Sequence, residues 1–416
     1  MKWAMKNLTL WGLVALLLFG PVIPSFAQDE IKIGGIISLT GPKAALGQEE
    51  KRGYDMAIDK INSLGGVLQK KVKLILEDDR FNPSVAVSAA EKLVAEDKVV
   101  AITGGYGSTE TLATLAALKN YAPVVVWQGA GAEKIEKLYG KEPWFFHLHP
   151  WGYYSLLDLK DFMLTLDPKP QSVAIAYEDT SYGVDYSKFA KKFWSEAGFK
   201  IVAFEPFKSG SFDYAPLITK LKAIQPTPDV FYWVGYVGDA VLLIRQSKEM
   251  NFNPRIFADT GGVGFPEFKK QLGKDCNYVL GIDIWSPKVK FPTSTKYPDL
   301  FPSSEQWLKD YRDRYNGRDP NYWSLISYVA LAATCQAIKD AGTTEKSKVI
   351  AALEKLDTMT PMGRLKFGAG SYGSIHQGYK QGLVFQWQEG EKQIVFPNNL
   401  KTGSVIYPTP VWDSRH

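Results

Sequence analysis

A glycine-rich loop that runs into a predicted helix is the strongest candidate for a binding site in this sequence. The loop Gly104-Gly105-Tyr106-Gly107-Ser108-Thr109 follows an apolar run, Val99–Thr103, and the helix is predicted over Ser108–Asn120. Glycines let the backbone come close to a ligand, and the free N–H groups at a helix start favour an anion. The hydroxyls of Ser108 and Thr109 add hydrogen-bond donors, so a ligand carboxylate would fit there. In the alternative interpretation, Ser108 only caps its own helix.

Three further loops carry aromatic side chains directly after predicted strands. The loop Trp127–Ala132 begins with a tryptophan that is large enough to wall a pocket or to fill a core. The loop Asp179–Gly183 contains Tyr182, and Gly235–Asp239 contains Tyr236. Both tyrosines either reach a ligand or cap the edge of a sheet without touching one.

An acidic side chain, Asp259, stands at the end of another predicted strand, within Ala258–Gly262. A buried carboxylate needs a cationic partner or good hydrogen bonds. If Asp259 faces a cleft, the ligand therefore carries an amine. In that case, replacing Asp259 by alanine is expected to abolish the binding of an amino acid.

Other combinations of chemical groups carry less weight. Glu77 and Asp79 share one face of a predicted strand, where such a pair could do acid–base work or hold a cation. His147 and His149 also share one strand face, but no third metal ligand is identifiable, so a structural or surface role is favoured. Gly368–Gly373 matches the glycine pattern of a dinucleotide-binding loop, but no helix is predicted after it. The sequence contains no nucleophile–base constellation, so the protein is not predicted to be an enzyme.

The loops belong to two similar series of alternating strands and helices. Strands of the first series are predicted at Ile31–Ile37, Val72–Leu76, Val99–Thr103 and Pro123–Val126. Strands of the second series are predicted at Ser172–Ala176, Ile201–Phe204, Val230–Trp233, Arg255–Ala258 and Tyr278–Trp285. Helices follow near Ser304–Asn316, Trp323–Ala341 and Glu345–Leu356, and the chain from Pro361 is β-like. This alternation predicts parallel sheets with helices on both faces, which bind ligands at the carboxyl ends of their strands.

The stretch Ser38–Val67, after the first strand, carries the most specific motif of the chain. Its helix is predicted to begin near Glu49 and to stop at Gly65-Gly66. The motif residues are Thr40-Gly41-Pro42, Gly47, Gly53, Ala57, Ile61-Asn62 and Gly65-Gly66-Val67. Their spacing closely resembles the first loop and helix of the periplasmic solute-binding proteins that serve branched-chain amino acid and amide ABC transporters. The resemblance covers nearly the whole chain after residue 27.

This resemblance implies the fold of a type I periplasmic binding protein. Two Rossmann-like α/β lobes would be joined by three hinge crossovers, with the ligand cleft between the lobes. The first lobe is expected to hold residues 28–148 and 282–360, and the second to hold residues 149–281 and 361–416. Crossovers are expected near residues 147–150, 281–285 and 358–363.

The resemblance also implies roles for the loops. Relatives hydrogen-bond the ligand carboxylate with a Ser or Thr in the loop that holds Ser108, and the loop around Gly131 meets the ligand with its backbone. Amino acid-specific members usually have Thr where Gly131 stands. A ligand without an amine therefore remains an alternative. A carboxylate for the ligand ammonium often stands near Asp259, although Thr260 can hold the aligned position; Glu77 and Asp79 are implied to be structural. The expected ligand-binding residues are Tyr106, Ser108, Thr109, Trp127, Gly129, Ala130, Gly131, Tyr182, Tyr236 and Asp259.

The first residues are predicted to be a secretory signal peptide. Lys2 and Lys6 precede an apolar run, Leu8–Phe19, and cleavage is expected after Ala27. Gln28 follows instead of a cysteine, so no lipid anchor is expected at the new end. An uncleaved membrane anchor is the alternative.

Length, charge and cysteine content restrict the function further. The 416 residues suit a signal peptide and two domains, and the formal charge of +5 is too mild for a nucleic-acid-binding surface. The two cysteines, Cys276 and Cys335, either form a disulfide in an exported protein or remain separate buried thiols.

These observations predict a periplasmic substrate-binding protein of an ABC importer that closes on a small carboxylate-bearing solute. A hydrophobic or branched-chain amino acid is the first choice of solute. An aromatic or other organic acid without an amine is the alternative, and a ligand sensor that signals to a membrane partner is an alternative role. The expected partners are the solute and an ABC transporter membrane permease, with no nucleic acid, metal or cofactor.

Overall fold

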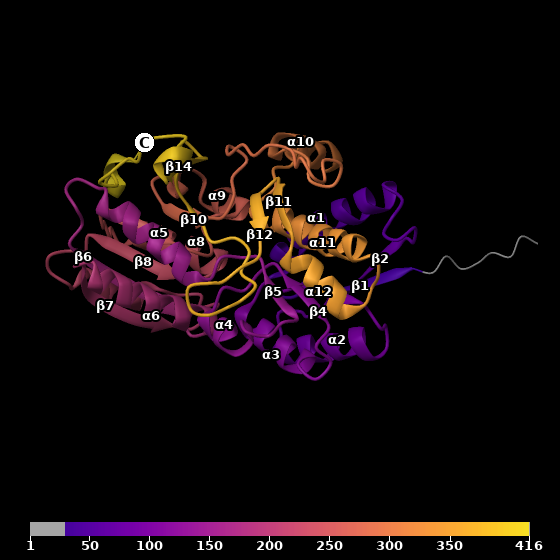
Figure 1. Cartoon of the computed structure of the whole chain (residues 1–416). Helices are drawn as coiled ribbons and strands as arrows, with labels where there is room; N and C mark the ends of the chain where they lie inside the picture. The colour runs from indigo at the N-terminus through magenta and orange to yellow at the C-terminus, as the bar shows by residue number, and fades with distance from the viewer. Residues whose placement is uncertain (1–29, 416) are drawn as a thin grey trace, which may run out of the picture.

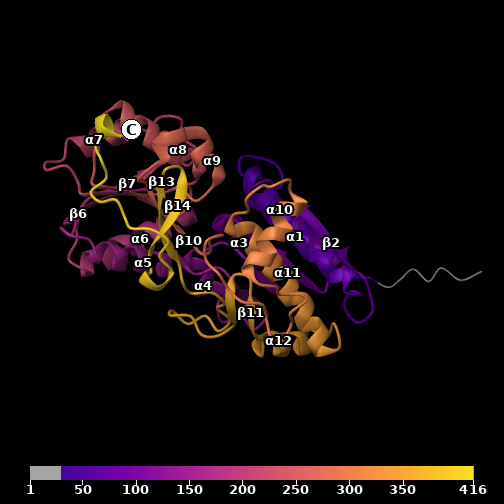
Figure 2. The same ribbon diagram turned by 90° about the horizontal axis from the view of Figure 1, so that it is seen from above.

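The computed structural model describes residues 30–415. The predicted signal peptide and its cleavage after Ala27 lie outside these residues. Within residues 30–415, no helix combines the length and apolar character needed to cross a membrane. The described chain folds into two α/β lobes that stand side by side, with connecting segments between them (Figures 1 and 2).

The first lobe is built on a parallel sheet of five strands in the order β2-β1-β3-β4-β5. The strands are β1 Ile31–Ile37, β2 Val72–Asp78, β3 Ala101–Gly104, β4 Val124–Trp127 and β5 Phe145–His147. The order reverses between β1 and β3, because β2 lies on one side of β1 and β3 on the other. A crevice at such a reversal, outside the carboxyl ends of the strands, is the usual ligand site of an open α/β sheet.

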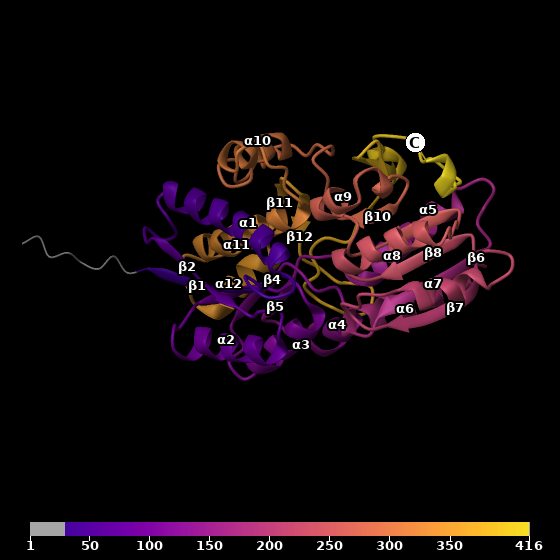
Figure 3. The ribbon, with the colours of Figure 1, turned by 180° about the vertical axis from the view of Figure 1, so that it is seen from behind.

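Helices cover both faces of this sheet, as Figure 3 shows from behind. One layer contains α1 Ala44–Ser63, α10 Ser304–Arg314, α11 Tyr322–Ala341 and α12 Lys346–Glu354, and the other contains α2 Pro83–Ala95 and α3 Ser108–Leu118. Helix α1 begins at Ala44, so its predicted start near Glu49 is wrong. Its N-cap residue, Lys43, makes no side-chain capping bond, which left no local signal for the true start.

The second lobe is built on a mixed sheet of seven strands in the order β14-β13-β10-β9-β8-β6-β7. The strands are β6 Ser172–Glu178, β7 Lys200–Phe207, β8 Val230–Val234, β9 Ile256–Asp259, β10 Leu280–Asp283, β13 Leu383–Gln388 and β14 Glu391–Phe396. Strands β6 to β10 run parallel, whereas β13 and β14 join antiparallel at the β10 edge.

Side chains along β6 alternate between two hydrophobic cores. Val173 and Ile175 belong to the larger core, and Ala174 and Ala176 belong to a separate core on the opposite face. This period of two is what a sheet with helices on both faces requires. The helices of this lobe are α5 Gly152–Leu164, α6 Ser181–Glu196, α7 Ala215–Lys222, α8 Val237–Glu249 and α9 Pro266–Leu272.

The chain passes between the two lobes three times. It crosses after β5, returns after β10 towards α10, and crosses again between the hairpin β11 Asp357–Thr360 with β12 Gly363–Lys366 and strand β13. One predicted lobe boundary, between residues 281 and 282, falls inside β10. The lobe boundaries as a set stay a prediction. Helix α4 Glu133–Tyr139 and three short 3-10 helices, Gly273–Cys276, Asn398–Leu400 and Trp412–Ser414, complete the regular structure of residues 30–415.

The two cysteines are free and buried in different cores. Cys276 lies in the core of the second lobe, and Cys335 lies on α11 in the larger core. Burial raises the pKa of the Cys276 thiol to about 11 and raises that of Cys335 as well. The structure therefore contains two separate buried thiols, one of the two alternatives that the sequence left open.

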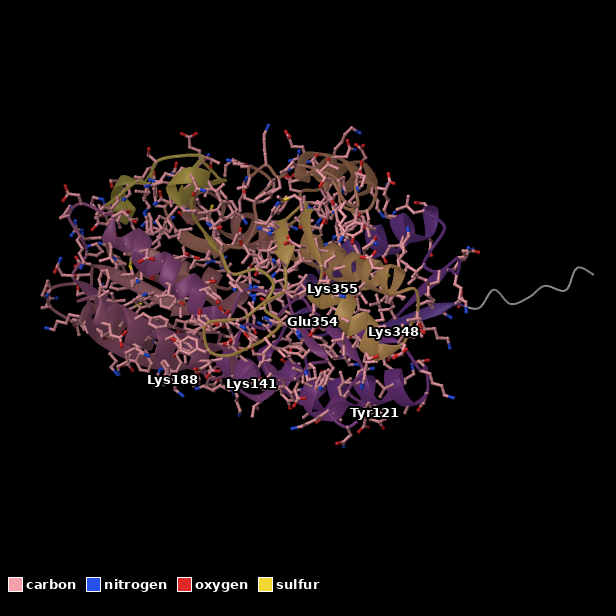
Figure 4. All side chains as sticks on the ribbon, viewed as in Figure 1. Tyr121, Lys141, Lys188, Lys348, Glu354 and Lys355 are labelled. Carbon is pink, nitrogen blue, oxygen red and sulfur yellow. The ribbon has the colours of Figure 1, made fainter. Side chains whose placement is uncertain are left out.

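Charged side chains of both signs are mixed over the face shown in Figure 4. Glu354 lies between Lys348 and Lys355 along α12, and Lys141 and Lys188 point outward from the two lobes. Such mixing is typical of an ordinary solvated surface.

Candidate functional site

A small cavity lies between the lobes, at the carboxyl ends of strands from both sheets. Its volume is about 40 Å³. The lining residues are Tyr106, Ser108, Ala130, Gly131, His149, Tyr182, Tyr186, Tyr236, Thr260, Gly261, Tyr322 and Trp323. We call the residues from the first lobe and the first crossover the first wall and those from the second lobe the second wall; the second wall is Tyr182, Tyr186, Tyr236, Thr260 and Gly261.

One larger hollow lies within the first lobe and is less suited to capture by closure of the lobes. The hollow beside Cys335 has a volume of about 380 Å³ and is lined by α1, α11 and the segment Lys296–Leu300. All of these belong to the first lobe, so closure of the lobes cannot act on a molecule bound there. The cavity between the walls is the candidate site because both sheets end at it.

The loop Gly104–Gly107 of the first wall is held tightly against the sheet. The N–H of Gly105 donates to the carbonyl of Ile36 (3.0 Å). Gly105 has φ +86°, and a Cβ added there would come within 1.9 Å of the Trp127 ring. Only glycine fits this position, since both the positive φ and the close approach exclude a side chain.

Beneath this loop lies a buried polar network. The side-chain oxygen of Gln128 accepts from the N–H of Gly104 (2.9 Å) and from the hydroxyl of Thr103 (3.0 Å). The side-chain amide of Gln128 donates to Oε1 of Glu50 (3.0 Å), which is fully buried. Burial raises the pKa of Glu50 to about 8, so this carboxyl is neutral at pH 7. The network fixes the loop backbone without placing a charge under it.

Ser108 is the first residue of α3 and is almost fully buried at the cavity. The N-cap residue is Gly107, which has no side chain to cap the helix, and the Ser108 hydroxyl makes no capping bond. The first N–H groups of a helix have no partner within it. Ser108 thus presents a hydroxyl and an open helix start, and the interpretation as a mere N-cap does not apply.

One acidic side chain lies close to this helix start. Oε2 of Glu110 lies next to Gly107, where an added Cβ would come within 2.0 Å of it. Burial raises the pKa of Glu110 to about 7, although the Glu110 backbone N–H and Lys43 lower it. When ionised, Glu110 would occupy the position that a helix start offers to an anion.

The next loop of the first wall divides its residues between the cavity and the core. Ala130 and Gly131 line the cavity, whereas Gly129 does not. Trp127 is buried under Gly105, where its indole N–H donates to the Thr111 hydroxyl (3.1 Å), so it supports the wall from behind.

The second wall consists largely of tyrosine hydroxyls and rings. Tyr182 stands at the start of α6, and Tyr236 is the N-cap residue of α8. The Thr260 hydroxyl lies 3.2 Å from the Tyr182 hydroxyl and 3.0 Å from the Tyr232 hydroxyl. These hydrogen bonds link the start of α6, strand β8 and the residue that follows β9.

The two walls touch in this conformation. The ring centroids of Tyr106 and Tyr236 lie 5.5 Å apart, and Tyr106 also packs on Trp323 (4.6 Å). The Lys43 ammonium lies 3.8 Å from the centroid of the Tyr236 ring, a distance typical of a cation–π contact. The described conformation is therefore closed, with aromatic rings filling most of the space between the lobes.

Asp259, the predicted partner of a ligand amine, lies outside the lining set. It is fully buried, and its Oδ2 accepts from the backbone N–H groups of Gly262 and Val263. Burial raises its pKa to about 7. The next residue, Thr260, lines the cavity in its place.

Of the predicted residues, the structure brings six together at the cavity and leaves four behind it. The six are Tyr106, Ser108, Ala130, Gly131, Tyr182 and Tyr236, and the four are Thr109, Trp127, Gly129 and Asp259. Their roles in binding stay predictions. The acidic pair Glu77 and Asp79 is engaged elsewhere: Glu77 pairs with Lys92, and Asp79 accepts from the Ser38 hydroxyl (2.6 Å). Among residues 30–415, no group of side chains suits a metal ion.

Six lining residues were not in the predicted set: Thr260, which was only an alternative to Asp259, and His149, Tyr186, Gly261, Tyr322 and Trp323. A Cβ added to Gly131 would lie 2.2 Å from the Tyr186 hydroxyl, so this tyrosine fills the space that a side chain at position 131 would take. Tyr186 stands one helical turn after Tyr182, a spacing that could have indicated it. Tyr322 and Trp323 open α11, far along the chain, and no local signal marked them.

Comparisons with known proteins agree with this architecture. A family model described as "Periplasmic binding protein" matches residues 30–392. Leu/Ile/Val-binding protein homolog 7 of Brucella abortus (strain 2308) is 26% identical over 392 residues, which cover 92% of this chain and 95% of the relative. Homolog 8 of the same strain is 26% identical over 387 residues, covering 90% and 92%.

Three solved structures share the fold. The leucine binding protein LivK from Thermotoga maritima MSB8 has a TM-score of 0.76 at 20% identity and covers 88% of this chain and 97% of its own. LivJ from Streptococcus pneumoniae, in complex with isoleucine, has a TM-score of 0.74 at 21% identity, with coverage of 91% and 100%. A solute binding protein of an ABC transporter from Rhodopseudomonas palustris BisB5, in complex with 3,4-dihydroxybenzoic acid, has a TM-score of 0.71 at 20% identity, with coverage of 88% and 95%.

Proposed function

Because this chain belongs to the periplasmic binding protein family, as a type I member of the leucine/isoleucine/valine-binding type, we propose that it captures a small carboxylate-bearing solute between its lobes for an ABC importer. Proteins of this family are extracytoplasmic solute-binding proteins. The same proposal includes export with cleavage after Ala27, delivery of the solute to a membrane permease, and binding of the solute without chemical conversion.

The observation that carries the proposal is the cavity at the meeting point of both sheets. Ser108 and the start of α3 offer a hydroxyl and backbone N–H groups on one side, and tyrosines face them from the other lobe. A carboxylate at Ser108 would receive charge-assisted hydrogen bonds away from bulk water. Tyr106, Ala130, Gly131, Tyr182 and Tyr236 would contact the rest of the solute, with Thr109, Trp127, Gly129 and Asp259 supporting them from behind.

Binding requires a change of conformation. The cavity volume of about 40 Å³ is far below the several hundred Å³ of typical small-molecule sites. A solute therefore enters an open form, in which Tyr106 and Tyr236 separate, and contacts from both walls favour the closed form. This is a two-state hinge in which the ligand shifts the population by binding the closed state better.

Two classes of solute fit such a site. A hydrophobic or branched-chain amino acid is the class predicted from the sequence, and isoleucine is bound by the related LivJ. An aromatic acid is favoured by the lining itself, which contains five tyrosines, a tryptophan and a histidine but no carboxylate for an ammonium group. The Rhodopseudomonas palustris protein binds such an acid. The geometry supports the aromatic acid better, because a buried ammonium without a carboxylate partner is costly.

A thermal-shift screen of the refolded, ligand-stripped protein tests the proposal. The panel contains leucine, isoleucine, their amides, benzoate and 3,4-dihydroxybenzoate. A ligand at about 100 times its Kd stabilises the folded state by about 2.7 kcal/mol, so the correct solute raises Tm clearly. Ser108→Ala should lose most of this shift while keeping the Tm of the ligand-free protein. A panel in which only the amides raise Tm would contradict a carboxylate site.

A second measurement separates import from sensing. The same chain could report a solute to a membrane partner, since closure would serve either role. Uptake of the identified solute by cells that contain or lack this protein tests import directly. Uptake that does not depend on the protein would favour the sensing role.

A further inference from the structure

Two histidines on the first crossover hold their protons on opposite nitrogens. Nε2 of His147 lies 2.8 Å from the carbonyl oxygen of Gly129 and 3.1 Å from that of Ala130. A carbonyl oxygen only accepts, so Nε2 of His147 carries the hydrogen. His147 is fully enclosed, stacked on Trp151 at 3.7 Å, and does not line the cavity. Its role is to hold the loop of the first wall.

His149, two residues later, has the reverse arrangement. Its Nδ1 lies 2.6 Å from the carbonyl oxygen of Pro150, so Nδ1 carries the hydrogen and donates it. Burial lowers the pKa of His149 to about 4, which keeps the ring neutral at pH 7. A neutral ring with its hydrogen on Nδ1 leaves a lone pair on Nε2. His149 therefore offers a hydrogen-bond acceptor, and within residues 30–415 that nitrogen has no hydrogen-bond partner.

The ring of His149 is held in place at the cavity. It stacks on Trp323, with centroids 5.4 Å apart and planes 13° from parallel, and it also contacts the Tyr322 ring. It is 92% buried and lines the cavity between the lobes. Stacking and the Pro150 bond together fix the ring, so the free acceptor cannot turn away from its position.

Other acceptors at the cavity either are engaged or belong to hydroxyls, which can donate as well as accept. The Thr260 hydroxyl is shared with Tyr182 and Tyr232, and Oδ2 of Asp259 accepts from the backbone N–H groups of Gly262 and Val263. No carboxylate stands among the lining residues. Nε2 of His149 thus differs from the hydroxyls of Ser108 and of the lining tyrosines, because it can only accept a hydrogen bond.

We propose that Nε2 of His149 accepts a hydrogen bond from the bound solute, so that the site selects carboxylates that also carry a hydroxyl or amine donor. The inference rests on the proposed function, because it assigns a specificity residue to the same site. It places the donor-recognising group on the first crossover, whereas the sequence had placed it at Asp259 on the second lobe. An acid that lacks the donor leaves this nitrogen unpaired in the closed form.

Matched pairs of probes test the selection. Leucine is compared with 4-methylpentanoate, which lacks its amine, and 3,4-dihydroxybenzoate with benzoate, which lacks its hydroxyls. In at least one pair, the wild-type protein should bind the donor-carrying member about 10- to 100-fold more tightly by calorimetry. His149→Phe keeps a ring on Trp323 without the acceptor and should reduce this preference to about threefold or less. His149→Gln, which can present an acceptor oxygen, should retain part of it.

A measurement on the unaltered protein guards against variants that fail to fold. With ¹⁵N-labelled histidine, the resonances of His149 should show hydrogen on Nδ1 and a lone pair on Nε2, and His147 should show the opposite. Addition of the tighter-binding probe should shift Nε2 of His149 and leave His147 unchanged. Hydrogen on Nε2 of His149, or no shift on binding, would overturn the inference.

The outcomes separate this inference from the proposed function. If the wild-type protein binds none of the four acids, the proposed function fails and the inference fails with it. If it binds both members of each pair equally, or if His149→Phe keeps the full preference, the proposed function stands and the role of His149 is refuted.

Discussion

The two walls of the cavity differ in the groups that they present to it. The first wall meets the cavity with the loop Gly104–Gly107 and the start of α3, and a buried network around Gln128 fixes this backbone from below. The second wall meets it with the side chains of Tyr182, Tyr186 and Tyr236, whose hydroxyls and rings pack on one another. The first wall thus combines fixed backbone with the side chains of Tyr106, His149, Tyr322 and Trp323, whereas the second is largely a layer of tyrosine side chains.

This difference predicts separate roles for the two walls in binding the solute. In the proposed function, backbone N–H groups would recognise the feature that all candidate solutes share, a carboxylate, from a loop that the Gln128 network holds in place. Tyrosine side chains can adapt to different solutes, and the bond between Tyr182 and Thr260 can be exchanged for one to a ligand. Preorganisation of the first wall would limit the cost of binding.

The largest expected effect concerns the neutral carboxyl beneath the first wall. The pKa of Glu50 is about 8 in the folded protein and lies near 4.5 in the unfolded chain. Between these values the folded protein keeps a proton that the unfolded chain releases, so the stability falls as pH rises from about 4.5 to about 8. Glu50→Gln removes this loss and should be more stable than wild type at pH 9 by up to roughly 5 kcal/mol.

Urea unfolding at pH 4 and pH 9 measures this difference. Glu77→Gln, at a partly exposed residue paired with Lys92, is the matched control and should show the pH dependence of the wild type. If Glu50→Gln and wild type lose stability equally between the two pH values, the carboxyl is not neutral in the folded state. In that case, a buried negative charge on Glu50 would lie beneath the loop of the first wall.

The second prediction concerns the close fit of the glycine loop. Gly105 and Gly198 have nearly the same positive φ, +86° and +88°, but no atom lies within 4 Å of a Cβ added at Gly198. Both alanine variants suffer the strain of a positive φ, about 1 kcal/mol. Gly105→Ala also collides with Trp127 and should cost roughly 2–3 kcal/mol more. Equal free energies of unfolding for the two variants would show that the loop is not tightly packed.

A third prediction tests whether Glu110 competes for the helix start. Its pKa of about 7 means that it is mostly ionised at pH 8 and mostly neutral at pH 6. Glu110→Gln should therefore raise the affinity for a carboxylate about fivefold at pH 8 and change it less than twofold at pH 6. Calorimetry with the acid identified in the screen measures both values. An increase of the same size at the two pH values would mean that the ionised Glu110 does not oppose the ligand.

The smallest effect is expected behind the second wall. Asp259→Asn keeps an oxygen that can accept from Gly262 and Val263 and removes the negative charge. Because Asp259 does not line the cavity, the affinity for leucine should change by about twofold or less. A loss of about a hundredfold would restore Asp259 as the partner of a ligand amine.

The sequence predicted most of the strands and the long helices, because their apolar residues repeat with clear periods. It missed α5, whose N-cap residue is Trp151 and carries no capping side chain. It also missed α4 and α9, which have only seven residues each and whose N-cap residues make no side-chain capping bond. These elements lack the local signals from which helix starts are predicted.

The two walls differed in how well they could be predicted. Glycines and Ser108 at the strand ends marked the first wall, because backbone approach needs particular residue types. The second wall depends on how the lobes close, so the position of Tyr186 opposite Gly131 was marked only by its helical spacing from Tyr182. Asp259 and Thr260 were ambiguous because a shift of one residue at a strand end exchanges the two faces.

Hydrogen exchange measured by mass spectrometry, with and without the solute identified in the screen, tests the central claim most directly. A solute held between the walls should slow exchange together in residues 104–112 of the first lobe and in residues 180–186 and 235–240 of the second. Slower exchange in only one lobe, or in the surface hollow beside Cys335 alone, would contradict capture between the lobes.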